Sequence, residues 1–382
     1  MQTAKTGKIM KKIFVTGITG LVGSAFVTAL SRDQKGTKFV CLTRKSPVKS
    51  AYDRVYDIVK EQCEFDGTPE LFNEIIGNIE VVDGDVTTIN PEEIAKLPVM
   101  EGVNSMFHCA ADVNLGKDPT GKTFKINYNG TENMIALAKL LNLKEFHYVS
   151  TAYVAGKTVG RAMEARPTCN EFNNPYESSK FQSEGLVRDC GIPFTIYRPG
   201  IIVGRLTDGR IRKPLAFYRI MEFLGVVKKH HCAKSGIPAN GVLASEVRLQ
   251  SPLSDRIYFT PIDYVQKAIS RLFCQPVANR GFHLTGESPV STVMIAEAMS
   301  CILKMPNLCV TKASLEENAD ERLIRKMIGD LMPYFETRIT FDSSSVREVL
   351  GDEILDWKMD VDFLKRMAFA YYKECSPELV QE

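Results

Sequence analysis

The stretch from Phe14 to Phe26 reads FVTGITGLVGSAF and places three regularly spaced glycines between two apolar runs. The run before the glycines, KIFVTG, is short and β-branched and predicts a strand, whereas LVGSAFVTALSR after it predicts a helix. Glycines at such a junction let the turn close tightly, let backbone amides approach a pyrophosphate, and let the helix pack on the strand. The amides and the dipole at the helix start favour phosphate. The stretch therefore predicts a nucleotide-binding strand–turn–helix unit.

Short apolar strands and helices alternate through the first half of the chain. Strands are predicted at 12–17, 38–44, 79–86, 104–111, 145–151 and 194–200, with later helices at about 119–141 and 175–189. Continuously apolar strands separated by helices are typical of a parallel sheet covered on both faces. We therefore expect an α/β protein with a Rossmann-type doubly wound parallel sheet and a smaller, mostly helical C-terminal substrate domain. The expected boundaries are 10–205 with 256–284 for the NADP-binding domain, and 206–255 with 285–382 for the substrate-binding region.

Composition narrows the classes of partner. The chain has 382 residues, a net charge of +2 and no long charged block, so neither nucleic acid nor an anionic membrane is indicated. Its ten cysteines are scattered without a CxxC pair, and no clustered ligands predict a metal site. The N-terminus has no apolar signal region and no apolar run is long enough to span a bilayer, so we expect a cytoplasmic protein. The cationic segment GRIRKP is a candidate contact for an anionic partner, and oligomeric state stays open.

The end of the second predicted strand bears on the choice of cofactor. An NAD enzyme usually places an acid there for the ribose hydroxyl, but CLTRKS supplies Thr43, Arg44 and Lys45 instead. A guanidinium at Arg44, assisted by Arg54, suits a 2′-phosphate through a charged bidentate contact. We therefore expect NADPH, with two ordinary surface arginines as the alternative.

Further strand ends complete the expected cofactor groove. Asp85 is placed to meet the adenine amino group, with Val86 on the ring, and Pro199 brings the backbone against the nicotinamide. The residues expected at the cofactor are Gly17, Thr19, Gly20, Leu21, Val22, Gly23, Arg44, Arg54, Asp85, Val86, Ala110, Ala111, Asn127, Ser150, Lys180, Pro199, Gly200 and Ile202.

A candidate catalytic set follows from PYESSK, which places Tyr176 and Lys180 one helical turn apart on one face. The lysine charge is expected to lower the pKa of the phenol, which then serves as general acid for a carbonyl oxygen that receives hydride. Thr151, in YVSTAYV at a strand end, is expected to hold the same oxygen. Tyr153 lacks a lysine four residues on, so we assign it to pocket lining or core. Asn127 is expected either to anchor a water or proton relay or to form a cap or turn.

The segments VTGITGLVG, LTRKS, GDV, HCAADV, YVSTAYV, YESSK, YRPGIIVG and FTPIDYV span about Lys12 to Val265. Together they resemble the extended short-chain dehydrogenase/reductases. Within these, the chain looks like the thioester-reductase group, which includes terminal reductase domains of peptide synthetases, carboxylic acid reductases and male-sterility-type fatty acyl-CoA reductases. The resemblance implies NADPH-dependent reduction of an acyl thioester to an aldehyde, with Tyr176 and Thr151 stabilising the oxyanion. It implies a substrate carried in trans by coenzyme A or a carrier protein, for which GRIRKP is a candidate dock; further reduction to the alcohol stays open.

Other interpretations remain at this point. Met221, Phe223 and Leu224 either line an acyl pocket or form helix core, and core is the commoner role for such residues. A sugar-nucleotide epimerase or dehydratase, or a 3β-hydroxysteroid-type dehydrogenase, would share the fold and the catalytic set. A non-catalytic NADP-bound sensor would share the fold alone and would not need Tyr176 as an acid.

Overall fold

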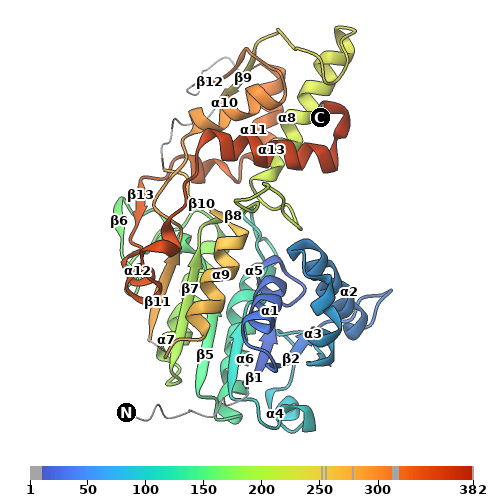
Figure 1. The fold of residues 1–382 in the computed structure, drawn as a ribbon. Helices are drawn as coiled ribbons and strands as arrows, with labels where there is room; N and C mark the ends of the chain where they lie inside the picture. The colour runs from blue at the N-terminus through green and yellow to red at the C-terminus, as the bar shows by residue number, and fades with distance from the viewer. Residues whose placement is uncertain (1–10, 251–252, 254–255, 278, 312–317, 381–382) are drawn as a thin grey trace, which may run out of the picture.

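The computed structural model describes residues 11–250, 253, 256–277, 279–311 and 318–380. Seven parallel strands form the central sheet in the order β11-β7-β5-β4-β1-β2-β3 (Figure 1). These strands are β1 (Lys12–Thr16), β2 (Lys38–Thr43), β3 (Ile79–Asp83), β4 (Ser105–His108), β5 (Glu145–Val149), β7 (Phe194–Pro199) and β11 (Arg280–Leu284). The expected Rossmann-type parallel sheet is confirmed. The strand order reverses between β1 and β4, which is where such sheets bind ligands.

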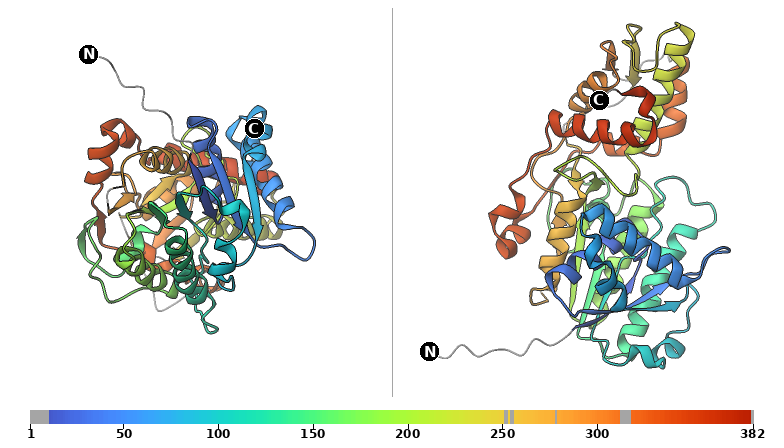
Figure 2. Two further views of the ribbon diagram at one scale, coloured as in Figure 1. Left: turned by 90° about the horizontal axis from the view of Figure 1, so that it is seen from below. Right: turned by 45° about the vertical axis from the view of Figure 1, so that its right-hand side comes forward.

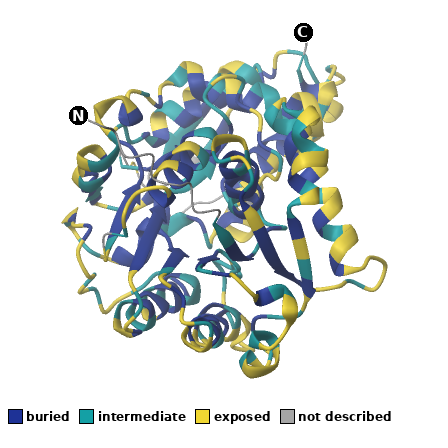
Figure 3. Ribbon diagram, turned by 60° about the horizontal axis from the view of Figure 1, so that its bottom comes forward, coloured by how far each residue is buried: buried dark blue, intermediate teal, exposed yellow. Residues whose placement is uncertain are grey.

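Both faces of the sheet are covered by helices (Figure 3). One face carries α1 (Leu21–Asp33), α2 (Ala51–Asp66) and α9 (Ile262–Phe273). The other carries α4 (Pro91–Ala95), α6 (Gly130–Leu140) and α7 (Pro175–Asp189). In β1, the fully buried Val15 belongs to the first of these cores and Phe14 to the second. A strand that buries both faces has to be apolar throughout, which explains the continuous run in the sequence.

The helix expected over 119–141 is interrupted near its start. It consists of the single turn α5 (Lys122–Phe124), a π-helical turn over Lys125–Asn129, and α6. Turns of π-helix are rare and are often found at functional sites. Asn127, one of the expected cofactor residues, lies in this turn.

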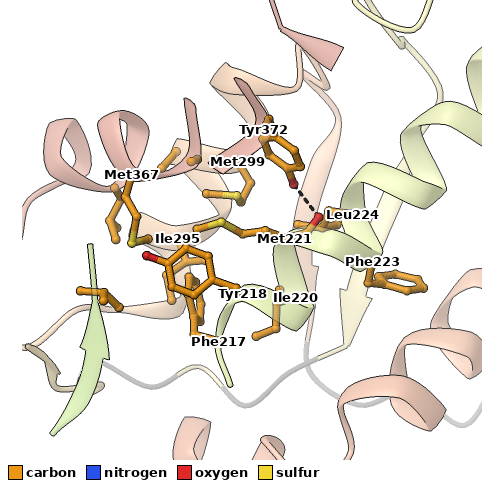
Figure 4. Close-up of a cluster of buried hydrophobic side chains, with 14 of the residues drawn as sticks. Phe217, Tyr218, Ile220, Met221, Phe223, Leu224, Ile295, Met299, Met367 and Tyr372 are labelled. Atoms are coloured by element: carbon orange, nitrogen blue, oxygen red, sulfur yellow. Dashed lines mark hydrogen bonds between the residues drawn. The ribbon is translucent and has the colours of Figure 1, made fainter. Parts of the chain in front are cut away.

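A mostly helical part lies beyond the carboxyl ends of the strands (Figures 1 and 2). It contains α8 (Tyr218–Lys234), α10 (Thr292–Ile302), α11 (Ala319–Ile328), α13 (Val361–Cys375) and the strand pair β9 (Val247–Gln250) with β12 (Leu308–Thr311). Figure 4 shows its core, in which Met221, Phe223 and Leu224 are fully buried. The Tyr372 hydroxyl donates to the Met221 carbonyl oxygen at 2.6 Å. These three α8 residues are therefore helix core.

The chain passes between the two parts several times. The strand pairs β8 (Ile201–Val203) with β10 (Phe259–Pro261), and β6 (Gly160–Ala162) with β13 (Ile339–Phe341), lie where the parts meet (Figure 1). After β10, α9 and β11 return to the sheet layer. The helix α12 (Ser344–Leu350), which we had placed in the substrate-binding region, instead packs on the sheet layer through Val346. The domain boundaries stay a prediction.

The remaining small elements do not alter this layout. The helix α3 (Phe72–Gly77) follows α2, and short 3-10 turns link several of the larger elements. Within the described ranges, no helix combines the length and the apolar character needed to cross a membrane.

Candidate active site

The glycine turn brings three backbone segments together with no room for side chains. Gly17 has φ +77°, and a Cβ there would lie 2.6 Å from the backbone nitrogen of Ala110. A Cβ on Gly23 would lie 2.2 Å from the Gly17 carbonyl oxygen. Gly20 donates its amide to Gly17 at 2.9 Å, and no side chain caps the start of α1. A helix start with uncapped amides in a glycine-lined turn fits the diphosphate of a dinucleotide.

A buried arginine, which we had not predicted as a site residue, supports this turn from the far side. The Arg212 guanidinium donates to the Gly20 carbonyl oxygen at 3.1 Å and to Ser24 Oγ at 3.0 Å. It also donates to Gln62 Oε1 at 2.9 Å, and only 4% of its side chain is exposed. Arg212 belongs to the cationic segment GRIRKP. At this position the expected dock for an anionic partner is wrong, because the guanidinium faces the glycine turn.

At the adenosine end, the predicted residues contact one another. Arg44 Nη1 donates to Asp85 Oδ2 at 3.1 Å, and 60% of the Arg44 side chain is exposed. The Arg54 guanidinium donates to the Arg44 carbonyl oxygen and so fixes the backbone there. Burial raises the pKa of Asp85, but hydrogen bonds from Thr87 and Arg44 outweigh burial and leave it below its ordinary value. Arg44 and Asp85 thus form one charged pair at the ends of β2 and β3.

Three of the predicted cofactor residues, which lie between β3 and α6, make contacts that stabilise the local backbone. The Asn127 side chain accepts from the Asp112 amide at 2.8 Å and donates to the Asp112 carbonyl oxygen at 3.1 Å and to Ser179 Oγ at 2.8 Å. Val86 is buried against Gly130. Ala110 donates its amide to Thr16 Oγ1 at 3.2 Å. These contacts of Asn127 fit the turn-forming role, and the water or proton relay stays a prediction.

The three candidate catalytic residues line one cavity. Thr151 directly follows the end of β5, and Tyr176 and Lys180 lie in the first half of α7. The Lys180 ammonium is 2% exposed, donates to the Val149 carbonyl oxygen at 2.5 Å, and lies 4.1 Å from the centroid of the Tyr148 ring. These contacts fix the ammonium one helical turn from the Tyr176 phenol.

Burial decides the protonation state of the Tyr176 phenol. Burial raises the pKa of Tyr176, and the Lys180 charge and the Thr151 hydroxyl lower it by less, so the pKa lies above its ordinary value. The expected net lowering is therefore wrong, although the lysine acts in the expected direction. Burial also lowers the pKa of Lys180, and it lowers that of the neighbouring His108 to about 3 with help from the Lys180 charge. A neutral phenol at Tyr176 holds a proton that it can donate.

The cavity has a volume of about 430 Å³ and runs from the glycine turn past Tyr176 to an apolar wall. The predicted residues that line it are Gly20, Leu21, Val22, Ala111, Ser150, Thr151, Tyr176, Lys180, Pro199, Gly200 and Ile202. The predicted residues outside its wall are Gly17, Thr19, Gly23, Arg44, Arg54, Asp85, Val86, Ala110 and Asn127. Tyr153 also lines this cavity, and pocket lining was one of the two roles that we expected for it.

We did not predict the apolar wall of this cavity from the sequence. It comes from the mostly helical part and from β10, and consists of Leu215, Ala216, Phe217, Phe259, Leu331, Tyr334 and Phe335. Phe259 stands in FTPIDYV, a segment already noted, and the apolar amphipathic stretch PLAFYRIMEFLGVV contains Leu215, Ala216 and Phe217. The remaining three residues belong to stretches with no distinguishing pattern. The cavity therefore joins polar groups suited to a carbonyl with a surface suited to a hydrocarbon.

Comparison with known proteins places this site in a family. The family described as male sterility protein, an NAD-binding domain, matches residues 15–269. The chain belongs to this family. The glycine turn and the catalytic set both fall within the matched range of the male sterility family. The resemblance to thioester-reductase-like extended short-chain dehydrogenase/reductases is thereby confirmed.

Individual relatives and solved structures are similar to this chain. The chain is 25% identical over 337 residues to the non-canonical nonribosomal peptide synthetase FrzA of Cladobotryum sp, which covers 84% of this chain and 30% of that protein. It is 26% identical over 226 residues to the fatty acyl-CoA reductase wat of Drosophila melanogaster, covering 50% and 43%. The chain thus spans less than half the length of either relative. The terminal R domain from the myxalamid PKS-NRPS pathway has the same fold, with a TM-score of 0.75, 21% identity and 98% and 94% coverage.

Proposed function

We propose that this chain uses NADPH to reduce an acyl thioester, carried by coenzyme A or a carrier protein, to an aldehyde. The observation that carries the proposal is the single cavity in which Thr151, Tyr176 and Lys180 face an apolar wall beside the glycine turn. Relatives named as a peptide synthetase and a fatty acyl-CoA reductase support the thioester as substrate. The cytoplasmic location expected from the sequence belongs to this proposal, and reduction onward to the alcohol is an outcome to be measured.

The residues present fit a dinucleotide. The uncapped start of α1 and the turn at Gly17, in which a Cβ has no room, suit the diphosphate. Arg44, with its largely exposed guanidinium, would meet the 2′-phosphate that distinguishes NADPH from NADH. When bound, NADPH supplies the hydride that reduces the thioester carbonyl carbon.

Side chains of the protein stabilise the charge on the carbonyl oxygen and supply the proton. As the carbonyl carbon is reduced, its oxygen gains negative charge, and the hydroxyls of Tyr176 and Thr151 would donate hydrogen bonds to it. Tyr176 gives its proton to that oxygen, and Lys180 stabilises the phenolate that remains. The resulting thiohemiacetal then breaks its carbon–sulfur bond and releases an aldehyde and a thiol. Thioester, NADPH and one proton thus give aldehyde, thiol and NADP⁺.

The apolar wall separates this proposal from the nucleotide-sugar alternative. A nucleotide sugar is charged and hydroxyl-rich and needs many polar partners in its pocket. The wall opposite Tyr176 instead offers Leu215, Phe217 and Leu331. Such a surface favours an acyl chain over a sugar.

The test is NADPH oxidation measured against acyl-CoAs, acyl-carriers, aldehydes and nucleotide sugars, with the aldehyde trapped and identified. The wild-type chain is expected to consume NADPH with a thioester and to release its aldehyde. Tyr176→Phe should lower kcat by on the order of 10²–10⁴-fold while NADPH still binds, because only the proton donor is lost. Tyr52→Phe, at an exposed tyrosine on α2, is the matched control and should be unchanged. A Tyr176→Phe variant with the wild-type rate would show that Tyr176 is not the proton donor, and a wild-type chain that binds NADPH but consumes none with any of these substrates would support the sensor interpretation.

A further inference from the structure

The segment 204–217, which leads from β8 to α8, contacts the start of α1. Its Arg212 side chain ties it to the Gly20 carbonyl oxygen in the glycine turn at 3.1 Å. Three residues further on, Leu215 and then Phe217 form part of the apolar wall of the cavity. One short stretch of chain therefore reaches both the expected cofactor end of the cavity and its apolar end.

Several contacts hold this segment in one conformation. At its beginning, the Gly204 amide donates to the Tyr218 hydroxyl at 2.9 Å. The Leu206 amide donates to the Asp263 carboxylate at 3.0 Å. Near its end, Ala216 has φ +40°, which is unfavourable for a residue with a Cβ and persists only where the surroundings hold it. The segment therefore has a defined position relative to the glycine turn.

Lys213, the residue after Arg212, brings a positive charge to this part of the cavity. It lines the cavity wall together with Gly20, and the residue is exposed. No carboxylate in the described part of the chain forms an ion pair with its ammonium. The start of α1 beside it carries uncapped amides, which favour negative charge. This end of the cavity is therefore suited to an anion.

The other charged groups of the cavity are already engaged. Besides Lys213, the charged residues in its wall are Lys180 and Asp112. The Lys180 ammonium donates to the Val149 carbonyl oxygen at 2.5 Å. The Asp112 carboxylate accepts a hydrogen bond from Thr123 Oγ1 at 2.8 Å. Among the described residues of this wall, Lys213 is therefore the cation left to meet the phosphates of a ligand.

We propose that Lys213 binds the diphosphate of the dinucleotide, together with the uncapped amides of the glycine turn. The diphosphate is negatively charged, and an ammonium adds a charge-assisted hydrogen bond to those that the amides offer. This inference rests on the use of a dinucleotide in the proposed function and adds a residue that binds it. Because NADPH and NADH share the diphosphate, Lys213 should strengthen the binding of both equally, whereas Arg44 should act on NADPH alone.

The test is direct titration of the full chain with NADPH and with NADH, followed by nicotinamide fluorescence in the absence of substrate. Lys213→Gln should weaken the binding of both cofactors by about tenfold, the size of one charge-assisted hydrogen bond. Lys213→Arg should keep most of the affinity because it keeps the positive charge. Lys234→Gln removes the same charge at an exposed position of α8 outside the cavity, and as the matched control it should change neither affinity.

A third ligand identifies the part of the cofactor that Lys213 contacts. ADP-ribose keeps the diphosphate but lacks the nicotinamide, and calorimetry should show the same loss of its binding to Lys213→Gln. A loss confined to NADPH would place the ammonium at the 2′-phosphate, and a loss absent with ADP-ribose would place it at the nicotinamide. Either result overturns the inference, as does unchanged binding of all three ligands.

The binding measurements also separate this inference from the proposed function. If the wild-type chain binds NADPH but reduces no thioester, and Lys213→Gln weakens binding as expected, the proposed function fails and the role of Lys213 stands. If thioesters are reduced while Lys213→Gln binds both cofactors like the wild-type chain, only the role of Lys213 is overturned.

Discussion

At the scale of single residues, the site depends on a phenol that burial keeps protonated. The neighbouring lysine opposes burial but does not overcome it, so the pKa of Tyr176 lies above its ordinary value. A reductase needs its acid protonated before the reaction and stabilised as the anion after it. The buried ammonium of Lys180, 2% exposed, supplies the second requirement without removing the first.

This arrangement predicts a one-sided pH profile. Because the pKa of Tyr176 is raised and that of Lys180 is lowered, the fall in kcat/KM for reduction on the alkaline side should begin with loss of the Lys180 proton. Loss of the Tyr176 proton should follow only above about pH 10. His108, with its pKa lowered to about 3, stays neutral on the alkaline side and adds no step. A steady-state profile in which kcat/KM rises with pH would contradict this assignment of the acid.

The polar half of the site could be predicted from sequence because its members stand close together in the chain or at strand ends. Tyr176 and Lys180 are one helical turn apart, and Thr151 directly follows a strand. Their local spacing in the sequence was therefore enough to predict that they lie in one site. The direction of the Tyr176 pKa could not be predicted, since it depends on burial by distant segments. The same holds for Arg212, whose contact with Gly20 joins residues far apart in the chain.

The proposed choice of NADPH over NADH also rests on one residue, Arg44. Arg44→Gln should raise KM for NADPH by about tenfold or more and leave KM for NADH nearly unchanged, because only the 2′-phosphate contact is lost. The measurement is steady-state kinetics with each cofactor at a fixed concentration of thioester. Arg32→Gln, an exposed arginine near the end of α1, serves as the control. Equal changes for NADPH and NADH would show that Arg44 acts on the shared part of the cofactor.

At the scale of elements, two structural features fix the relative positions of the strands and helices that form the site. The glycine turn sets the distance between β1, α1 and the end of β4. A buried ion pair joins α7 to β7: Arg198 donates to the two carboxylate oxygens of Glu184 at 2.9 and 2.6 Å, and both side chains are at most 1% exposed. Since Glu184 lies one turn after Lys180 and Arg198 directly precedes Pro199, this pair aligns the catalytic helix with the nicotinamide end of the groove.

The glycine turn can be tested against a glycine of the same conformation in open space. Gly17 and Gly67 have φ of +77° and +71°, but only at Gly17 would a Cβ meet other atoms within 4 Å. Gly67→Ala should cost about 1–2 kcal/mol of stability for the conformation alone. Gly17→Ala should cost a further 1–3 kcal/mol or so from overpacking, and should weaken NADPH binding as well. Denaturant unfolding and cofactor titration of both variants check this; equal costs would show that the close approach to Ala110 is unimportant.

The elements themselves were mostly predictable. Strands such as β2 and β7 were expected within one or two residues, because a buried parallel strand is a continuous apolar run. The strand β11 was anticipated only as part of a return to the sheet layer, since its short sequence RGFHL contains a buried histidine. The π-helical turn had no local signal, because it depends on the contacts that Asn127 makes with the loop at Asp112.

At the scale of the whole molecule, the site exists only where the two parts meet. The Rossmann-type layer supplies the candidate catalytic residues, and the mostly helical part supplies most of the apolar wall, against which the proposed acyl chain would lie. Met221, Phe223 and Leu224 were the residues considered for that wall, and they are core. The true lining comes from the segment before α8 and from the turn after α11, whose proximity to Tyr176 is a property of the tertiary fold.

The last prediction concerns which acyl chains this joint cavity accepts. Leu215 lines the cavity and is 37% exposed, so a larger side chain can be placed there without disturbing the core. Leu215→Trp should fill part of the space for the acyl chain and lower kcat/KM for long acyl thioesters by about tenfold or more, with short ones little affected. Leu323→Trp, at a leucine on α11 that is 42% exposed, is the control and should change neither. The measurement is kcat/KM across a series of acyl lengths on one carrier. A parallel loss at every length would show that Leu215 lies by the reacting carbonyl, because only a wall along the chain can discriminate by length.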